Sequence, residues 1–281
     1  MRITITGADG QLGRELQSAF PNDVILGLVW PAFDLLKPDV EAQILATEPD
    51  VVIHGAAYTN VDQAEKEPDV AMAVNAQGTA RVARAAARVG AKLVYISTDY
   101  VFDGTKRSPY DENDEPRPLG VYGRSKHEGE RQALAACTNA LVVRTSWLYG
   151  RHGANFVKSI MRFARERSEL RVVDDQRGSP THAGDLAAIV AELIGRNVSG
   201  IAHAAGSGDC TWYEFASEIV ADMGVRIPVH PISTAEANRL APRPAYSVLG
   251  KRVLTREGLS LPHWKAALAK FVQDTKIAGE A

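Results

Sequence analysis

The chain has 281 residues, of which 45% are hydrophobic and 23% are charged, and its formal net charge is −2. This composition is typical of a globular protein with one large domain or two coupled ones. Acidic and basic residues are interspersed, which disfavours a nucleic-acid-binding surface. No apolar stretch approaches the roughly 20 residues that span a bilayer, and the N-terminus lacks the features of a signal peptide. We therefore expect a cytoplasmic enzyme that binds neither nucleic acid nor membrane.

Cysteine and histidine usage gives no sign of a disulfide framework or a metal site. Cys137 and Cys210 lie far apart in the sequence and form no CxxC pattern, which suits a reducing compartment. The histidines are scattered and show no metal-ligand spacing. His54 lies in an apolar run, which favours a buried, hydrogen-bonded histidine over a catalytic one.

Short β-branched runs alternate with helical patterns through the first half of the chain. Strands are predicted over residues 2–6, 24–29, 51–54, 92–97 and 140–144, and helices over 11–20, 70–89 and 122–137. Strands separated by helices of this length imply a parallel sheet with helices on both faces. Ligands of such sheets bind beyond the carboxyl ends of the strands, so residues that follow the strands are the candidates for function.

The second half is less regular. Helices are predicted over residues 155–167, 183–194 and 260–272, an extended run over 170–174, and a capping box at Thr211. Residues 226–246 are rich in proline and are expected to be loop. The predicted fold is an α/β doubly wound parallel (Rossmann) sheet with a smaller, loop-rich α/β substrate lobe. Residues 1–149, completed by part of 180–205, would form the dinucleotide-binding domain, and residues 150–179 and 206–281 the substrate lobe.

A glycine motif, Gly7-Ala-Asp-Gly10-Gln-Leu-Gly13, follows the first strand directly. Gly7 permits a tight turn, Gly10 lets a pyrophosphate approach the backbone, and Gly13 lets helix and strand pack closely. Residues 28–33, LVWPAF, carry neither an acid for the adenosine ribose nor an arginine for a 2′-phosphate. The motif therefore predicts a nicotinamide dinucleotide and leaves NADH and NADPH as alternatives.

Tyr122-Gly-Arg-Ser-Lys126 is a YxxxK motif on a predicted helix. The i,i+4 spacing places the phenol and the ammonium group on one helix face, where the cation favours phenolate. The motif follows a strand that ends in Ser97-Thr98, whose hydroxyls could bind a substrate carbonyl. In this order, the glycine motif, the hydroxyl-bearing strand end and YxxxK indicate a reductase with Tyr122 as general acid.

Several strings of the sequence resemble the dTDP-4-dehydrorhamnose reductase family, and the similarity covers nearly the whole chain. These strings are GADGQLG (7–13), AAYTNVDQAE (56–65), NAQGT (75–79), STDYVFDG (97–104), YGRSK (122–126), RTSWLYG (144–150), NFV (155–157), DQRGSPT (175–181) and RPAYS (243–247). STDYVF followed by RTSWLYG is far more specific than the general signature of extended short-chain dehydrogenases.

The resemblance assigns roles to individual residues. It implies the catalytic set Thr98, Tyr122 and Lys126. It implies cofactor contacts from Gly7, Gly10, Gln11, Leu12, Gly13, Asp34, Leu35, Ala57, Tyr58, Thr59, Tyr122 and Lys126. It implies substrate contacts from Thr98, Asp99, Trp147, Asn155 and Arg243. At the end of the second strand the sequence departs from the usual pattern, and Asp34 and Leu35, the residues implied for the adenosine side, follow this departure.

Some of these residues have plain structural alternatives. Trp147 could belong to the core instead of stacking on a base or sugar ring, and residues 175–181 could be a structural loop instead of a pocket wall. Arg243 is a candidate for the diphosphate because a guanidinium binds phosphate in bidentate fashion. Glu65, Glu67 and the run 111–115 are interpreted as solvated charges.

The family implies NAD(P)H-dependent reduction of the C4 keto group of dTDP-4-dehydro-β-L-rhamnose to dTDP-L-rhamnose. Two alternatives stay open: a reductase or epimerase for another nucleotide-linked 4-keto-6-deoxyhexose, and a cofactor-binding regulatory subunit without activity. The expected partner is a small sugar nucleotide, and the enzyme is expected to be a monomer or a homodimer.

Overall fold

The computed structural model describes residues 1–277, and its centre is a parallel sheet of six strands in the order β10-β5-β4-β3-β1-β2. The strands are β1 (Arg2–Thr6), β2 (Val24–Leu28), β3 (Val51–His54), β4 (Lys92–Thr98), β5 (Leu141–Thr145) and β10 (Gly200–His203). The chain leaves β2 at one edge and returns on the other side of β1, so the strand order reverses between β1 and β3. This switch point is where an open α/β sheet binds its ligand.

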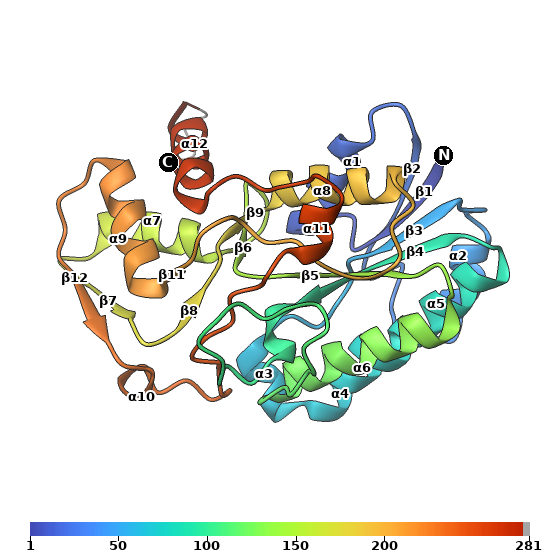
Figure 1. The fold of residues 1–281 in the computed structure, drawn as a ribbon, viewed down its shortest axis with the longest axis horizontal. Helices are drawn as coiled ribbons and strands as arrows, with labels where there is room; N and C mark the ends of the chain where they lie inside the picture. Colours follow the sequence, from blue (N-terminus) through green and yellow to red (C-terminus); the bar gives the residue numbers. More distant parts are fainter. Residues whose placement is uncertain (278–281) are drawn as a thin grey trace.

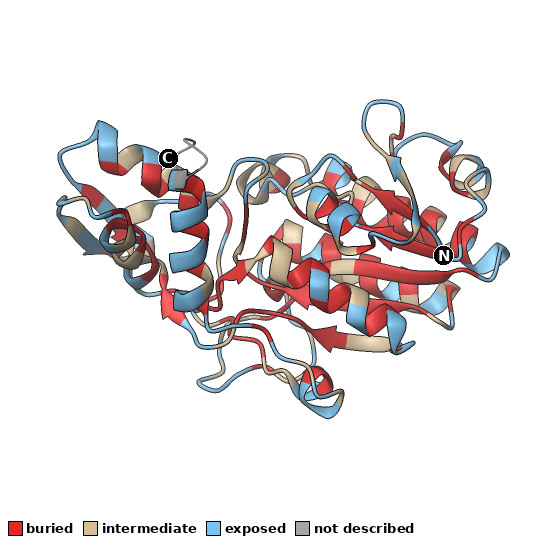
Figure 2. Cartoon of the chain, turned by 90° about the horizontal axis from the view of Figure 1, so that it is seen from above, coloured by how far each residue is buried: buried red, intermediate tan, exposed pale blue. Residues whose placement is uncertain are grey.

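Helices cover both faces of the sheet, as the sequence predicts (Figure 1). One face packs against α1 (Gln11–Ala19) and α8 (Ala183–Gly195). The other packs against α2 (Val40–Leu45), α5 (Thr79–Arg88) and α6 (Val121–Ala136). Figure 2 shows the inner strands almost entirely buried. This double coverage explains why β3, β4 and β5 are continuous apolar runs instead of alternating ones.

The helix predicted over residues 70–89 is interrupted. It consists of α4 (Pro68–Met72), a π-helical stretch (Ala73–Gly78) and α5. Within the π-helical stretch, Asn75 accepts a hydrogen bond from the backbone N–H of Tyr58 and donates to Ser125. Such bulges are frequent at functional sites, and this one aligns the loop after β3 with α6.

The second lobe has a hydrophobic core of its own, between α7 (Phe156–Glu166), α9 (Trp212–Met223) and α12 (Trp264–Ile277). These helices lie together at the left of Figure 1. Two small sheets complete the lobe: β7 (Leu170–Val173) with β12 (Val229–Ile232), and β8 (Arg177–Gly178) with β11 (Cys210–Thr211). The capping box at Thr211 is confirmed: its hydroxyl accepts from the Glu214 N–H, and the Glu214 carboxylate accepts from the Thr211 N–H.

The remaining elements are short. They are α3 (Val61–Lys66), a 3₁₀ turn (Asp99–Val101), β6 (Leu148–Tyr149), β9 (Thr181–His182), α10 (Thr234–Ala237) and α11 (Arg252–Arg256). β6 and β9 pair with each other in parallel. None of the helices among residues 1–277 combines the length and the hydrophobicity that crossing a membrane requires.

In two places the second half of the chain differs from the sequence prediction. The last helix begins at Trp264 and not near residue 260, because the backbone on both sides of His263 hydrogen-bonds with Ser207. Residues 226–246 are not all loop, since they contain β12 and α10. β12 tolerates Pro231 because it lies at the edge of a two-stranded sheet, where one side of the strand needs no donors.

Candidate active site

The glycine turn after β1 is shaped by close contacts that exclude larger side chains. Gly7 has φ +70° and its N–H donates to the Leu28 carbonyl. A Cβ on Gly13 would lie 2.2 Å from the Gly7 carbonyl oxygen, so only glycine fits there. Among the described residues, no side chain caps the start of α1 at Gly10. The N-terminal N–H groups of this nine-residue helix are therefore suited to phosphate oxygens.

A cavity of about 760 Å³ opens beside this turn. The carboxyl ends of β3, β4 and β5, the start of α6 and the aromatic residues Phe156 and Trp212 form its other walls. Twelve of the residues to which the resemblance assigns a role line it: Gly7, Gly10, Gln11, Leu12, Gly13, Ala57, Thr59, Thr98, Asp99, Tyr122, Lys126 and Trp147. The fold thus brings the glycine motif, the strand end and YxxxK to one space.

Lys126 is buried in the cavity wall, and Tyr122 is half-buried beside it. Burial raises the pKa of Tyr122 to about 12, with a smaller contribution from the Asp99 charge, while a hydrogen bond with the Thr98 hydroxyl acts in the opposite direction. The Lys126 ammonium donates to the Ile96 carbonyl at 2.6 Å, and burial lowers its pKa to about 7 against the opposing charge of Glu130. Tyr122 is therefore a protonated acid at neutral pH.

Thr98 and Asp99 face Tyr122 from the end of β4. The Thr98 hydroxyl donates to Asp99 Oδ1 at 3.1 Å and accepts from the Tyr100 N–H at 3.2 Å. The other carboxylate oxygen, Asp99 Oδ2, accepts from the Ser247 hydroxyl at 2.5 Å. Burial raises the pKa of Asp99 to about 7, although these hydrogen bonds lower it.

A buried ion pair behind Lys126 was not anticipated from the sequence. Arg144, on β5, donates to both carboxylate oxygens of Glu130, on α6, at 2.8 and 2.7 Å. The Ser97 hydroxyl donates to the same carboxylate at 2.6 Å, so it is not oriented towards a substrate carbonyl as predicted. The only hint in the sequence was an arginine in an otherwise apolar strand, because a buried arginine requires a partner.

Trp147 packs against another aromatic residue and also lines the cavity. Its ring stacks on Trp212, with 3.5 Å between the ring centroids and 6° between the planes. Both rings also line the cavity. Gly178 lies against the Trp147 ring, where a Cβ would come within 2.4 Å of it. The tryptophan is therefore part of the aromatic packing of the second lobe and part of the cavity wall.

Five residues to which the resemblance assigns a role do not line this cavity: Arg243, described below, and Asp34, Leu35, Tyr58 and Asn155. Asp34 accepts from the Leu36 N–H, and Leu35 is buried in the core beside Gly78. Tyr58 donates its hydroxyl to Glu67. Asn155 caps α7 and donates to the Gln11 side chain at 2.8 Å, so it joins the glycine-motif helix to the second lobe.

Arg243 lies in a second cavity, of about 910 Å³, which shares Tyr100, Phe156 and Trp212 with the first. Its guanidinium is held by the Asp62 carboxylate of α3 through two contacts, at 3.0 and 3.2 Å. Three more arginines line this space: Arg167, Arg171 and Arg239. A cationic cavity of this kind is suited to an anionic ligand.

The carboxylates interpreted as solvated charges include several with defined partners, which corrects the sequence interpretation. Glu65 accepts from the Val121 N–H at the start of α6, and Glu67 accepts from Tyr58. Glu112 is only 5% exposed and accepts from the Val253 N–H of α11. The contacts of Glu65 and Glu112 join elements that are far apart in the sequence, and no local pattern reveals them.

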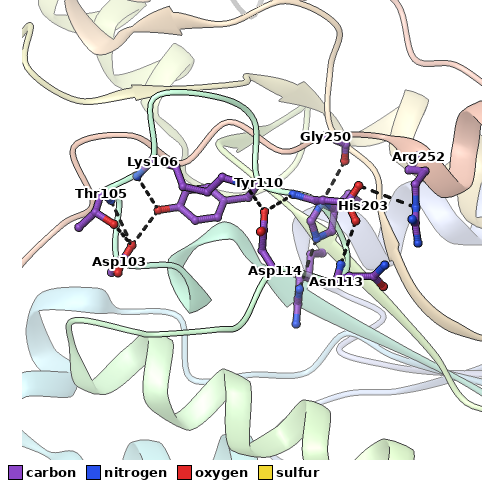
Figure 3. A network of polar contacts seen from close by, with 11 residues as sticks. Asp103, Thr105, Lys106, Tyr110, Asn113, Asp114, His203, Gly250 and Arg252 are labelled. Carbon is purple, nitrogen blue, oxygen red and sulfur yellow. Dashed lines mark hydrogen bonds and ion pairs between the residues drawn. The ribbon is translucent and has the colours of Figure 1, made fainter.

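The segment after β4 is held in place by a polar network (Figure 3). Asp103 accepts from Thr105 and from the Tyr110 hydroxyl, and Lys106 pairs with Asp114 at 2.5 Å. His203 contacts the Gly250 carbonyl at 3.0 Å. The network fixes the loop that leads from Asp99 to α6.

His54 matches its interpretation as a buried, hydrogen-bonded histidine. Its ring nitrogens contact the hydroxyls of Thr6 at 2.7 Å and Thr79 at 3.1 Å. Burial, together with the charge of Lys126, lowers the pKa of His54 to about 3, so the ring is neutral at physiological pH.

A doubly wound parallel sheet with a glycine turn at its switch point and a YxxxK helix beside it is the arrangement of the extended short-chain dehydrogenase/reductase class. Within that class, the chain belongs to the family described as RmlD substrate binding domain, whose model matches residues 1–277.

Named relatives span the whole chain. A dTDP-4-dehydrorhamnose reductase of Sinorhizobium fredii is 42% identical over 294 residues, covering 100% of this chain and 99% of the relative. A probable dTDP-4,6-dihydroxy-2-methyloxan-3-one 4-ketoreductase of Streptomyces antibioticus is 42% identical over 292 residues, with 99% and 97% coverage. The crystal structure of dTDP-4-dehydrorhamnose reductase from Bacillus anthracis in complex with NADP has a TM-score of 0.95 and 42% identity, covering 98% of this chain and 99% of that one.

Proposed function

We propose that this chain reduces the C4 keto group of dTDP-4-dehydro-β-L-rhamnose to give dTDP-L-rhamnose, with NADPH or NADH as reductant. The observation that carries the proposal is the protonated Tyr122, which lines the same cavity as Thr98, Lys126 and the glycine turn. The full-length similarity to enzymes with this name supports the same substrate. We further propose that the enzyme acts in the cytoplasm, as a monomer or a homodimer.

The residues present fit a nicotinamide dinucleotide. Gly10 and the uncapped start of α1 would hold the pyrophosphate, with Gln11 and Leu12 beside it. Ala57 and Thr59 would line its path after β3, while Asp34, Leu35 and Tyr58 would contribute from outside the cavity lining. When bound, the reduced nicotinamide supplies the hydride for the sugar carbonyl carbon. The glycine contacts alone do not discriminate between NADPH and NADH.

The chemistry of the protein side is proton donation. Tyr122 protonates the oxygen that becomes an alkoxide during reduction, and the nearby Lys126 ammonium favours the phenolate that results. Thr98 holds the reacting oxygen beside Tyr122. These groups act on charge that develops in the transition state, where a positioned donor has its largest effect on rate.

The second cavity would receive the nucleotide part of the substrate. This cavity meets the first one at Tyr100, Phe156 and Trp212, so a diphosphate held by its arginines would place the sugar towards Asp99 and Tyr122. Arg243 would bind the diphosphate with its planar guanidinium, while Asp62 holds the group in place. Asn155 would act on the substrate only indirectly, by holding α7 against Gln11.

The experiment that tests this function is a substrate panel. Purified protein is mixed with dTDP-4-dehydro-β-L-rhamnose or with another 4-keto-6-deoxy sugar nucleotide, each with NADH and NADPH, and products are identified by NMR. Preferred consumption of the rhamnose precursor supports the proposal. Preference for another keto sugar, as the Streptomyces relative suggests, changes the substrate. Isomerised product without cofactor consumption indicates an epimerase, and no turnover with any keto sugar favours a regulatory subunit.

A further inference from the structure

Asp99 is held from two directions by residues that are far apart in the sequence. Thr98 contacts Oδ1 from the neighbouring position, and Ser247 contacts Oδ2 from the loop between α10 and α11. Asp99 and Ser247 are each 2% exposed, and Thr98 is 7% exposed. No arginine or lysine pairs with the Asp99 carboxylate among the described residues, so hydroxyl groups supply its side-chain contacts.

Ser247 reaches Asp99 because its own backbone is fixed on the second lobe. Its N–H donates to the Arg177 carbonyl at 2.8 Å, and the Arg177 N–H donates to the Ala245 carbonyl at 2.8 Å. Arg177 is the first residue of β8, and Gly178, the second, packs on Trp147. The wall of the substrate lobe thus positions the hydroxyl that contacts Asp99.

We propose that Asp99 and Thr98 form a proton relay that reloads Tyr122 after each reduction, and that Ser247 is the positioning residue of this relay. The inference rests on the proposed function, because it needs Tyr122 to lose a proton to the substrate. Thr98 is the link, since its hydroxyl donates to Asp99 and it lines the same cavity as Tyr122, whose pKa it lowers.

The proton balance is simple. The Tyr122 O–H bond breaks and its proton goes to the substrate alkoxide. The Thr98 hydroxyl proton then passes to the phenolate while the proton of a neutral Asp99 passes to Thr98, which reverses the Asp99–Thr98 hydrogen bond. Asp99 ends as a carboxylate that accepts hydrogen bonds from the hydroxyls of Ser247 and Thr98, in the direction that the structure shows for these two bonds. It regains a proton from water through the cavity that it lines.

The titratable groups around Asp99 define the alternatives. Its charge reaches Tyr100 on its own turn and Tyr122 on α6, and it raises the pKa of both phenols. Arg243, from the same loop as Ser247, contacts Tyr100. Lys126, one helical turn beyond Tyr122, has a pKa lowered to about 7 and is the rival proton donor. Its ammonium, however, is directed at the Ile96 carbonyl.

The pH dependence of kcat separates Asp99 from Lys126. For the wild type we expect kcat to fall above neutral pH, because Asp99 then loses its proton before the reaction begins. Ser247→Ala removes a hydrogen bond that lowers the pKa of Asp99, so this fall moves to higher pH by about one unit. Ser247→Thr keeps the hydroxyl and restores the wild-type profile. Asp99→Asn has a lower kcat and no fall in this range.

The control is Ser207→Ala, which removes a hydroxyl that contacts the Leu261 carbonyl and leaves Asp99 untouched. Its profile should coincide with that of the wild type. A fall that stays at the same pH in Ser247→Ala assigns it to Lys126 and overturns the relay. A lower kcat with an unmoved profile makes Ser247 merely structural, which also overturns it.

Infrared spectroscopy of the free protein gives a readout without turnover. A protonated carboxyl band should be present below neutral pH, should disappear on titration through neutrality and should be absent in Asp99→Asn. Absence of the band in the wild type contradicts the relay. If the band is present but no keto sugar is reduced, the proposed function has failed and not the assignment of Asp99.

Discussion

Tyr122 is approached from two sides that are built in different ways. On the helix side, Tyr122, Lys126 and Glu130 lie on successive turns of α6, so their relation follows from the 3.6-residue repeat. On the opposite side, Thr98 and Asp99 end a strand, and Ser247 arrives from a loop almost 150 positions later. The helix side carries the cation and the strand side the carboxyl group. The helix side can therefore adjust the pKa of Tyr122, and the strand side can return its proton.

Removing the group between the two sides gives the largest expected effect. Tyr122→Phe keeps the ring and loses the proton that the alkoxide receives, so kcat should fall by about 10²–10⁴-fold. Steady-state kinetics measure this fall, and fluorescence titration with NADPH should show that cofactor binding is retained. A variant with near-native turnover would show that another group donates the proton.

The buried support of the helix side is tested by Glu130→Gln. Arg144 then loses its partner in the core, which should destabilise the fold by about 3–5 kcal/mol in chemical denaturation. Glu128→Gln, at a half-buried position of the same helix that pairs with the exposed Arg131, is the matched control, with a change of less than about 1 kcal/mol.

Acid should act on the same pair. Hydrogen bonds and charge from Arg144 outweigh burial and lower the pKa of Glu130 from 4.5 to about 2. The native state therefore binds this proton less readily than the unfolded one, and the stabilisation is present above about pH 4.5 and lost towards pH 2. Glu130→Gln should lack this part of the pH dependence, and an unchanged acid profile would contradict the assignment.

The loop that supplies Ser247 to the strand side also carries Arg243. Arg243→Lys keeps the charge and loses the planar fork, so KM for the sugar nucleotide should rise about tenfold with kcat little changed. Arg239→Lys, which alters an exposed arginine of the same cavity, is the control and should change KM less. Equal effects of the two would mean that Arg243 contributes only its charge.

The smallest expected effect concerns the helix cap at the start of α9 in the second lobe. Thr211→Ala removes the cap of α9 and should lower stability by about 1 kcal/mol, while kcat and KM stay near native. Thr211→Ser should retain most of the stability. A change in kinetics as large as that of Arg243→Lys would show that the second lobe transmits strain to the site.

The comparison of the two sides also explains what could be predicted from the sequence. The strands, the glycine turn, the spacing of Tyr122 and Lys126 and the capping box of Thr211 depend on short-range geometry, and the structure agrees with them. The contacts of Ser97 with Glu130, of Asp62 with Arg243 and of Asp99 with Ser247 depend on chain segments that only tertiary packing brings together. The sequence wrongly predicts Glu65 and Glu112 to be solvated for the same reason, because their backbone partners lie on distant elements.

The central claim is that, in this cavity, hydride passes from the reduced nicotinamide to the sugar C4 carbon while Tyr122 protonates the carbonyl oxygen. The most direct test is reduction of dTDP-4-dehydro-β-L-rhamnose with NADPH that carries deuterium on the transferable position of nicotinamide C4, followed by NMR of the product. The account predicts dTDP-L-rhamnose with deuterium at C4 in the wild type and almost no product from Tyr122→Phe. Product without deuterium at C4, or conversion that consumes no reduced cofactor, would contradict it.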